Sequence, residues 1–146
     1  MWTQRVQYAI RTLIVLAMHG NSRVSSRQIA EQYGIPRKYL ETILVDLRQN
    51  GFVQSAKGKA GGYSLTRDPS RIRLSDVIGA FEPEWFVTGE RSPSGGPARA
   101  EMERREPEEP VLSVLRERFL AALTNVTVAD ALMQWQQHRQ TLNYSI

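Results

Sequence analysis

The chain has 146 residues, enough for one domain or for one small domain with an assembly extension. Its 41% hydrophobic residues can form a core, and its 23% charged residues are ordinary for a water-exposed protein. It contains no cysteine, which excludes disulfides, thiol catalysis and thiolate-bound metals or iron–sulphur clusters.

The net charge of +4 is unevenly distributed. Residues 1–81 carry twelve Lys and Arg against five Asp and Glu, whereas residues 82–146 carry seven against ten. A basic first half favours a polyanion such as nucleic acid over an ordinary solvated surface, and an acidic second half favours solvation or a protein partner.

Other classes of function find little support. His19 and His138 lie far apart, so no zinc site and no other cofactor are expected. No nucleophile–base pair or carboxylate cluster indicates an enzyme. The apolar run Leu13 to Met18 is too short for a signal peptide or a membrane span, so we expect a cytoplasmic protein.

Two helices are predicted before residue 35. Thr3 can cap the first, which ends at Gly20-Asn21 and whose apolar face is formed by Val6, Ile10, Leu13, Ile14 and Ala17. Ser25 and Gln28 form a capping box that starts the second helix, and Gly34 stops it.

A third helix is predicted over Arg37 to Asn50, after Pro36 at a position that needs no intrahelical N–H donor. Its apolar face consists of Leu40, Ile43, Leu44 and Leu47. Its opposite face consists of Arg37, Lys38, Glu41, Thr42, Val45 and Arg48. Such a helix fits a major groove about 12 Å wide, although an isolated helix with this face is more often merely solvated.

A basic turn follows. Strands at 52–55 and 63–65 flank Lys57-Gly58-Lys59-Ala60-Gly61-Gly62, where glycines permit the turn and lysines can bind phosphates or a narrow minor groove. The phosphate-loop pattern of nucleotide-binding proteins fails, because Ala60 replaces its Ser or Thr. A helix-turn-helix followed by such a ribbon predicts a winged helix.

The remaining chain is predicted to be helical on either side of a long loop. A short helix over 75–81 precedes a proline-rich segment at 83–110. A helix over 110–123 carries an apolar stripe formed by Leu112, Leu115, Phe119, Ala122 and Leu123. This stripe either forms the contact surface of a dimer or packs against the chain's own core. Thr127 and Asp130 form a second capping box before a helix over 128–138.

Taken together, several motifs resemble the Rrf-type (IscR/CymR-like) family of winged-helix transcription regulators. They are Tyr8-Ala9, Tyr39-Leu40-Glu41, residues 47–53, residues 58–65, residues 74–78 and residues 125–128. The resemblance covers most of the chain. It implies a homodimer crossed by a long helix near 110–123 and bound to an imperfect palindrome.

The resemblance also suggests roles for single residues. Glu41 matches a glutamate that helps to set base preference, and Lys57 replaces a wing arginine that enters the minor groove. Arg5, Tyr8 and Ser25 fall near phosphate contacts of the family.

One departure from the family is as informative as the match. Cluster-binding members carry three cysteines in the loop that here spans 84–110, and this loop has none. Its glutamates are poor replacements for thiolates, and Ser92 or Ser94 as engineered cysteine substitutes are a less favoured alternative. A cysteine-free member that responds to a protein or small-molecule effector fits better.

The predicted fold is therefore mainly α with a small β-wing: a winged helix-turn-helix at 1–82, a loop at 83–109, and a dimerisation helix with a C-terminal helix at 110–146. We expect a dimeric regulator that binds a double-stranded DNA operator without a cofactor. The alternative is a protein-interaction module that works through residues 84–110. The predicted DNA-binding residues are Arg5, Tyr8, Ser25, Arg27, Arg37, Lys38, Tyr39, Glu41, Thr42, Arg48, Lys57, Lys59, Gly61 and Gly62.

Overall fold

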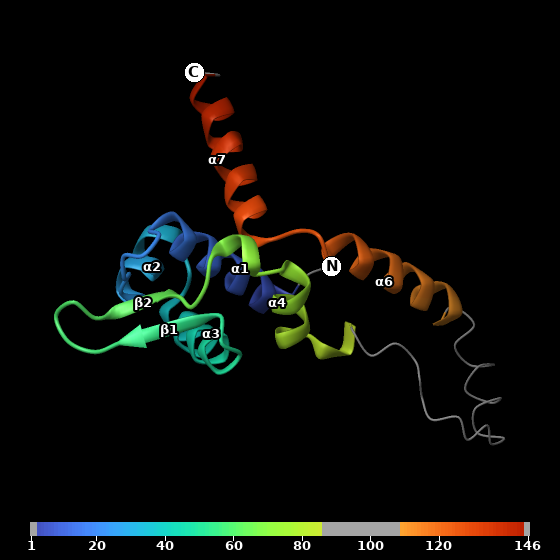
Figure 1. Cartoon of the computed structure of the whole chain (residues 1–146), viewed down its shortest axis with the longest axis horizontal. Coiled ribbons are helices and arrows are strands. Elements are labelled where there is room, and N and C mark those ends of the chain that lie inside the picture. The colour runs from blue at the N-terminus through green and yellow to red at the C-terminus, as the bar shows by residue number, and fades with distance from the viewer. Residues whose placement is uncertain (1–2, 86–108, 145–146) are drawn as a thin grey trace.

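A computed structural model describes residues 3–85 and 109–144 of the chain. It is mainly helical with one two-stranded antiparallel sheet, so the predicted fold class is confirmed (Figure 1). The elements in chain order are α1 (Gln4–Met18), α2 (Ser26–Tyr33), α3 (Arg37–Gln49), β1 (Val53–Ala56), β2 (Gly62–Leu65), the 3-10 turn η1 (Pro69–Arg71), α4 (Leu74–Phe81), the 3-10 turn η2 (Pro83–Trp85), α6 (Glu109–Leu123) and α7 (Val128–Tyr144).

The predicted helix caps are present. Thr3 Oγ1 accepts from the Val6 N–H at 3.4 Å. Ser25 Oγ accepts from the Gln28 N–H at 3.2 Å while Gln28 Oε1 accepts from the Ser25 N–H at 3.0 Å, which is a complete capping box. Gly34 ends α2 with a φ of +63°, a conformation that costs glycine little.

The core lies between α1, α3 and α4. Leu13, Leu16, Leu40 and Leu47 are 0% exposed, and Ile43 and Leu44 of α3 are also buried, as predicted. Burial of one leucine side chain contributes on the order of 1.5–3 kcal/mol, so this cluster fixes the angle of α3. Not every residue on the predicted face of α1 is covered, since Ile10 and Ile14 are only half-buried.

The wing is attached to the helical core by backbone hydrogen bonds. In the sheet, Val53 pairs with Leu65 and Ala56 with Gly62. Val24, between α1 and α2, exchanges two hydrogen bonds with Tyr63 of β2 at 2.9 and 2.8 Å. The φ of +132° at Gly62, where a Cβ would lie 2.8 Å from the Val24 carbonyl oxygen, requires glycine at this crossing.

The C-terminal helices are anchored where they meet. The Val128 N–H donates to the Ile72 carbonyl at 2.9 Å, the Leu74 N–H donates to the Val126 carbonyl at 2.8 Å, and the Val128 side chain is 0% exposed. Thr127 and Asp130 form the predicted second capping box, with contacts of 2.8 and 3.2 Å. From this joint α6 and α7 extend away from the body in different directions (Figure 1).

The larger differences from the predicted boundaries lie in the C-terminal half. The last helix continues to Tyr144 rather than ending at 138, because its exposed outer turns carry no strong apolar periodicity for the prediction to follow. The predicted loop at 83–109 begins with η2, and its residues 86–108, including Ser92 and Ser94, lie outside the described part of the chain.

Among the described helices, none is both long and apolar enough to cross a membrane.

Candidate nucleic-acid interface

The outer face of α3 presents polar side chains from its first turn to its last. The six residues predicted for this face are all exposed: Arg37, Lys38, Glu41, Thr42, Val45 and Arg48. Tyr39 and Gln49 are exposed as well. The opposite face is buried in the core, so the helix is held rigidly while this surface stays open. A rigid helix with arginine, lysine and glutamate outward can meet base edges in a major groove.

Arg37 and Glu41 form an ion pair one turn apart on this face. Arg37 Nε lies 3.2 Å from Glu41 Oε1, and the two side chains are 71% and 59% exposed. An exposed pair of this kind contributes about 0–1 kcal/mol, so either group can exchange its partner for a base at little cost. The pair holds the N–H donors of a guanidinium and the acceptor oxygens of a carboxylate side by side at the start of α3.

Two tyrosines extend this surface toward α1. Tyr39 is 56% exposed, and its ring centroid lies 6.2 Å from that of Tyr8. The Tyr8 hydroxyl accepts from Gln4 Nε2 at 3.1 Å, which orients the ring. The structure thus brings Tyr8 next to the first turn of α3.

Arg5, which was predicted to contact a phosphate of DNA, already has two partners within the protein. Its Nη2 lies 2.7 Å from Asp46 Oδ2 of α3, and its guanidinium lies over the Phe81 ring, 5.1 Å from the centroid. Arg5 therefore also joins α1 to α3 and α4. Its predicted phosphate contact stays a prediction.

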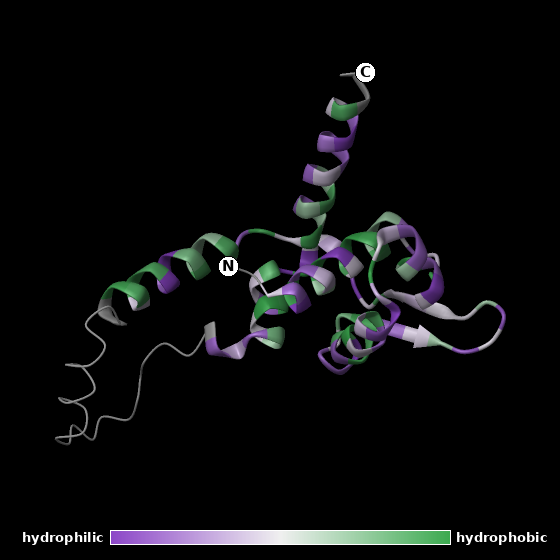
Figure 2. Cartoon of the chain, turned by 180° about the vertical axis from the view of Figure 1, so that it is seen from behind, coloured by the Kyte–Doolittle hydropathy of each residue, from purple (hydrophilic) through white to green (hydrophobic). Residues whose placement is uncertain are grey.

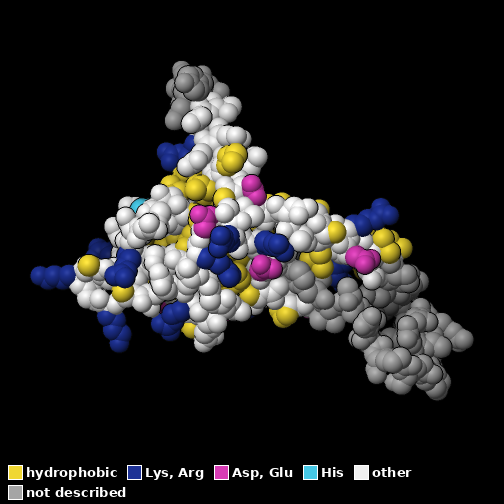
Figure 3. All heavy atoms as spheres, in the orientation of Figure 1, with side chains coloured by type: hydrophobic (Ala, Val, Ile, Leu, Met, Phe, Trp, Pro, Cys, Tyr) yellow, Lys and Arg dark blue, Asp and Glu magenta, His cyan; other side chains and the backbone are white. Residues whose placement is uncertain are grey.

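The wing supplies the second basic element. Lys57 and Lys59 are exposed in the turn between β1 and β2, and Lys and Arg side chains project from the wing end of the molecule (Figure 3). A Cβ at Gly61 would lie 2.5 Å from the Ala56 carbonyl oxygen, so the turn closes tightly only with glycine there. The two lysines are thereby carried on a short, defined loop.

A polar hollow of about 800 Å³ separates the wing from α2. Ser25 and Gln28 line it from the start of α2, and Lys59 and Gly61 line it from the wing. Three predicted contacts that lie far apart in sequence, Ser25, Lys59 and Gly61, therefore border one cavity. The start of a helix and a lysine both favour an anionic group there.

Two further predicted residues serve partly within the protein. Arg27 pairs with Glu31 of the same helix at 2.8 Å. Arg48 Nη1 donates to Ser55 Oγ of β1 at 3.4 Å, which links the end of α3 to the wing. Both remain exposed enough to contact DNA as well.

Comparisons with known proteins agree with this geometry. The Rrf2 family, described as an iron-dependent transcriptional regulator, matches residues 2–134. The chain belongs to the Rrf2 family. It is 37% identical over 82 residues to an rrf2-like HTH-type transcriptional regulator of Rhodobacter capsulatus, an alignment that covers 53% of this chain and 55% of that protein.

Longer alignments also exist. An HTH-type transcriptional regulator of Synechocystis sp. is 33% identical over 132 residues, covering 88% of this chain and 84% of that one. The solved structure of CymR, the global cysteine regulator of B. subtilis, superposes with a TM-score of 0.71 at 26% identity, covering 92% of this chain and 97% of CymR. The predicted family is thus confirmed, while the chain spans about half the length of the first relatives it matches.

The donor atoms of this Rrf2 chain do not fit a thiolate-held iron–sulphur cluster. The chain has no cysteine. Within residues 3–85 and 109–144, no three His, Asp or Glu side chains lie close enough together to hold a metal ion. We therefore assign no step of its action to iron.

Sequence reasoning missed several residues that organise this Rrf2 interface. Arg23 Nη1 donates to the Ala60 carbonyl of the wing at 3.4 Å, Gln4 orients Tyr8, and Asp46 holds Arg5. A basic residue two positions before the capping box was the available signal for Arg23. Asp46 contacts Arg5 of another helix, so only the packed structure reveals that pair. Gln4 and Tyr8 lie four residues apart on one face of α1, so their spacing was an available signal.

Proposed function

We propose that this Rrf2-family chain is a dimeric, sequence-specific regulator that binds a palindromic operator through α3 and the wing, without an iron–sulphur cluster. One observation carries the proposal: the exposed Arg37–Glu41 pair on α3 stands on the same reading unit as the exposed wing lysines, Lys57 and Lys59. The Arg37–Glu41 pair can contact base edges, and the two lysines can bind the phosphate backbone of DNA.

The start of α3 provides the base-reading groups. An arginine such as Arg37 can bond O6 and N7 of guanine together, and a carboxylate such as Glu41 can accept from N4 of cytosine. Because both lie in the first two turns, they are where a recognition helix meets base edges. Tyr39, exposed on the side of α3 that faces Tyr8, adds an apolar contact.

The wing provides affinity that does not depend on sequence. Lys57 and Lys59 neutralise phosphates or enter a narrow minor groove, and Arg23 with the Val24–Tyr63 bridge holds the wing against the helices. A wing held this way keeps its lysines at a constant distance from α3.

The exposed apolar side chains of α6 favour dimerisation. Val111 is 62%, Val114 48% and Leu115 57% exposed, and Figure 2 shows hydrophobic residues along much of this helix. An isolated protruding helix with such a surface gains free energy by packing against another surface. Leu112, Phe119 and Ala122 are also exposed, whereas Leu123 already packs partly against its own core.

A dimer of this kind would bind a palindromic operator. Helix-turn-helix dimers commonly read two half-sites about one helical turn apart, so two copies related by a two-fold axis through α6 present two α3 helices to one operator. The absence of cysteine from the sequence supports signalling without a thiolate-held cluster.

Selection of genomic DNA fragments by the purified chain at physiological salt tests the proposal. We expect recovered fragments to share a palindrome, and the Arg37→Ala variant to recover fewer of them. Recovery of random fragments alone would contradict sequence-specific binding, and would turn attention to a protein partner bound through residues 84–110.

A further inference from the structure

The polar face of α3 has an apolar side chain at its centre. Val45 is 43% exposed, whereas its neighbour Leu44 is buried in the core. Since an α-helix turns by about 100° per residue, Val45 lies about 160° around the axis from the buried Leu47 and about 40° from Glu41. Val45 therefore points away from the core, into the middle of the face that carries the reading residues.

The stability of α3 alone does not account for a valine at this position. A β-branched side chain is less favourable than alanine in a helix, and apolar surface left in water stabilises nothing. A single exposed apolar residue is nevertheless common in proteins, so the neighbours of Val45 decide what it can do.

These neighbours make the centre of the face apolar. Thr42 lies three residues before Val45 on the same side of the helix. Thr42 Oγ1 donates to the Lys38 carbonyl oxygen at 3.4 Å, so the hydroxyl hydrogen is used within the helix. The other large exposed apolar residue of α3, Tyr39, lies toward Tyr8 of α1, with ring centroids 6.2 Å apart. Val45 is thus the apolar contact that α3 offers at the centre of its polar face.

The wing lies on the far side of Val45 from the start of α3. Arg48, one turn after Val45, donates from Nη1 to Ser55 Oγ of β1 at 3.4 Å, and α3 lies beside β1 (Figure 1). Val45 therefore stands between the Arg37–Glu41 pair and the point where α3 meets the wing. DNA that contacts both the pair and the wing lies against Val45.

We propose that Val45 is a specificity-determining residue that contacts the C5-methyl group of a thymine in the operator. Valine has no hydrogen-bonding group in its side chain, and the thymine methyl is the apolar group that the major groove presents. Glu41 and Val45 lie about 6 Å apart along the helix axis, and base pairs repeat about every 3.4 Å. The thymine therefore lies within about two base pairs of the pair that Glu41 contacts. This inference rests on the proposed DNA-binding function.

Replacement of thymidine by deoxyuridine tests the contact, because deoxyuridine pairs in the same way and lacks only the methyl group. Each thymine in one half-site of the selected operator is replaced in turn, and fluorescence anisotropy measures the affinity. We expect one replacement to weaken wild-type binding about fourfold, which corresponds to one methyl group left unburied. Val45→Ala should weaken binding to the thymine operator by a similar factor and should no longer respond to that replacement.

Two other variants serve as controls. Val111→Ala removes the same atoms from an exposed valine of α6, and should keep the fourfold ratio between the two operators. Val45→Ile retains an apolar side chain and should keep the ratio as well. Because Val45 is exposed and alanine favours a helix, Val45→Ala should melt at the wild-type temperature, which separates loss of the contact from misfolding.

Methylated cytosine provides a second measurement of the same contact. An operator is made with a C·G pair in place of the T·A pair that responds to deoxyuridine. Methylation of this cytosine at C5 restores the methyl group without the thymine oxygen, so it should raise wild-type affinity about fourfold. The affinity of Val45→Ala should not change.

The outcomes separate this inference from the proposed function. A recovered palindrome whose binding is unaffected by deoxyuridine, or equally affected in the wild type and Val45→Ala, would overturn the role of Val45 and leave the DNA-binding function standing. An operator without thymine within about two base pairs of the pair that Glu41 reads would do the same. Recovery of random fragments alone would contradict both.

Discussion

Arg5 of α1 and Asp46 of α3 form an ion pair of 2.7 Å between residues 41 positions apart. The Asp46 side chain is 23% exposed and that of Arg5 52%, so the pair lies at the edge of the core rather than in open solvent. It ties the side of α3 to α1, opposite the end where Arg37 and Glu41 begin the reading face.

Asp46→Asn should therefore lower the free energy of unfolding by about 0.5–1 kcal/mol, the upper part of the range for exposed pairs. Urea denaturation measures the change. Glu31→Gln, which breaks the fully exposed pair with Arg27 on α2, should cost less. Equal losses in the two variants would show that the link between helices adds nothing.

Lys57→Ala and Lys59→Ala should each weaken binding to all DNA sequences. If each lysine contacts one phosphate, the slope of log affinity against log salt should fall by about 0.9 per contact, because fewer counterions are released. Fluorescence anisotropy over a range of salt concentrations measures the slope. Arg139→Ala on α7 is the control and should keep the wild-type slope, whereas unchanged slopes in both lysine variants would contradict the role of the wing.

Glu41→Ala should change which operators bind rather than how tightly DNA binds in general. We expect a cost on the order of 1–3 kcal/mol at the base pair that Glu41 reads, and tolerance of other bases there. Competition between operators substituted one base pair at a time measures this preference. Uniform weakening across all of them would mean that Glu41 acts only through its ion pair with Arg37.

Leu115→Arg should separate the dimer. A charge placed in an apolar seam loses its hydration when two α6 helices pack, so the dimer dissociation constant should rise at least about tenfold. Sedimentation at several protein concentrations measures it. Glu117→Arg, on the other side of α6, is the matched control, and an unchanged mass for Leu115→Arg would place the dimer seam elsewhere.

The pH dependence of stability should include Asp130 at the start of α7. Hydrogen bonds from the Thr127 hydroxyl and backbone N–H lower the pKa of this carboxyl below its ordinary value. The unfolded chain binds that proton near pH 3.9, so the stabilisation is complete above this pH and is lost as the pH falls through the lower folded pKa. Asp130→Asn should flatten the acid limb of a urea-unfolding series, and a limb parallel to that of the wild type would contradict this.

Local features of this fold were readable from the sequence because they depend on neighbours within one turn. The Ser25–Gln28 and Thr127–Asp130 boxes join residues three positions apart, and the apolar and polar faces of α3 follow from its own periodicity. The basic turn with its glycines was equally local. Such patterns, with the motifs shared by the Rrf2 family, determined the winged helix and the candidate reading residues.

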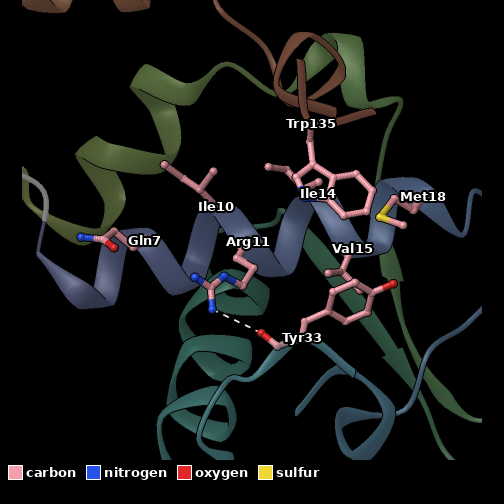
Figure 4. A pocket seen from close by; sticks show the side chains of 8 residues that line it. All are labelled: Gln7, Ile10, Arg11, Ile14, Val15, Met18, Tyr33 and Trp135. Atoms are coloured by element: carbon pink, nitrogen blue, oxygen red, sulfur yellow. Dashed lines mark hydrogen bonds between the residues drawn. The ribbon is translucent and has the colours of Figure 1, made fainter. Parts of the chain in front are cut away.

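Tertiary structure decided which distant residues meet. The Arg5–Asp46 pair, the Tyr8–Tyr39 contact and the Arg23 bond to the wing each join separate elements. Ile14 of α1 and Trp135 of α7 likewise border one pocket although they lie far apart in sequence (Figure 4). No spacing in the sequence encodes these distances, because they depend on how the buried faces of α1, α3 and α7 pack together. The sequence determined the parts of the reading unit, and the packing of its core determined their positions.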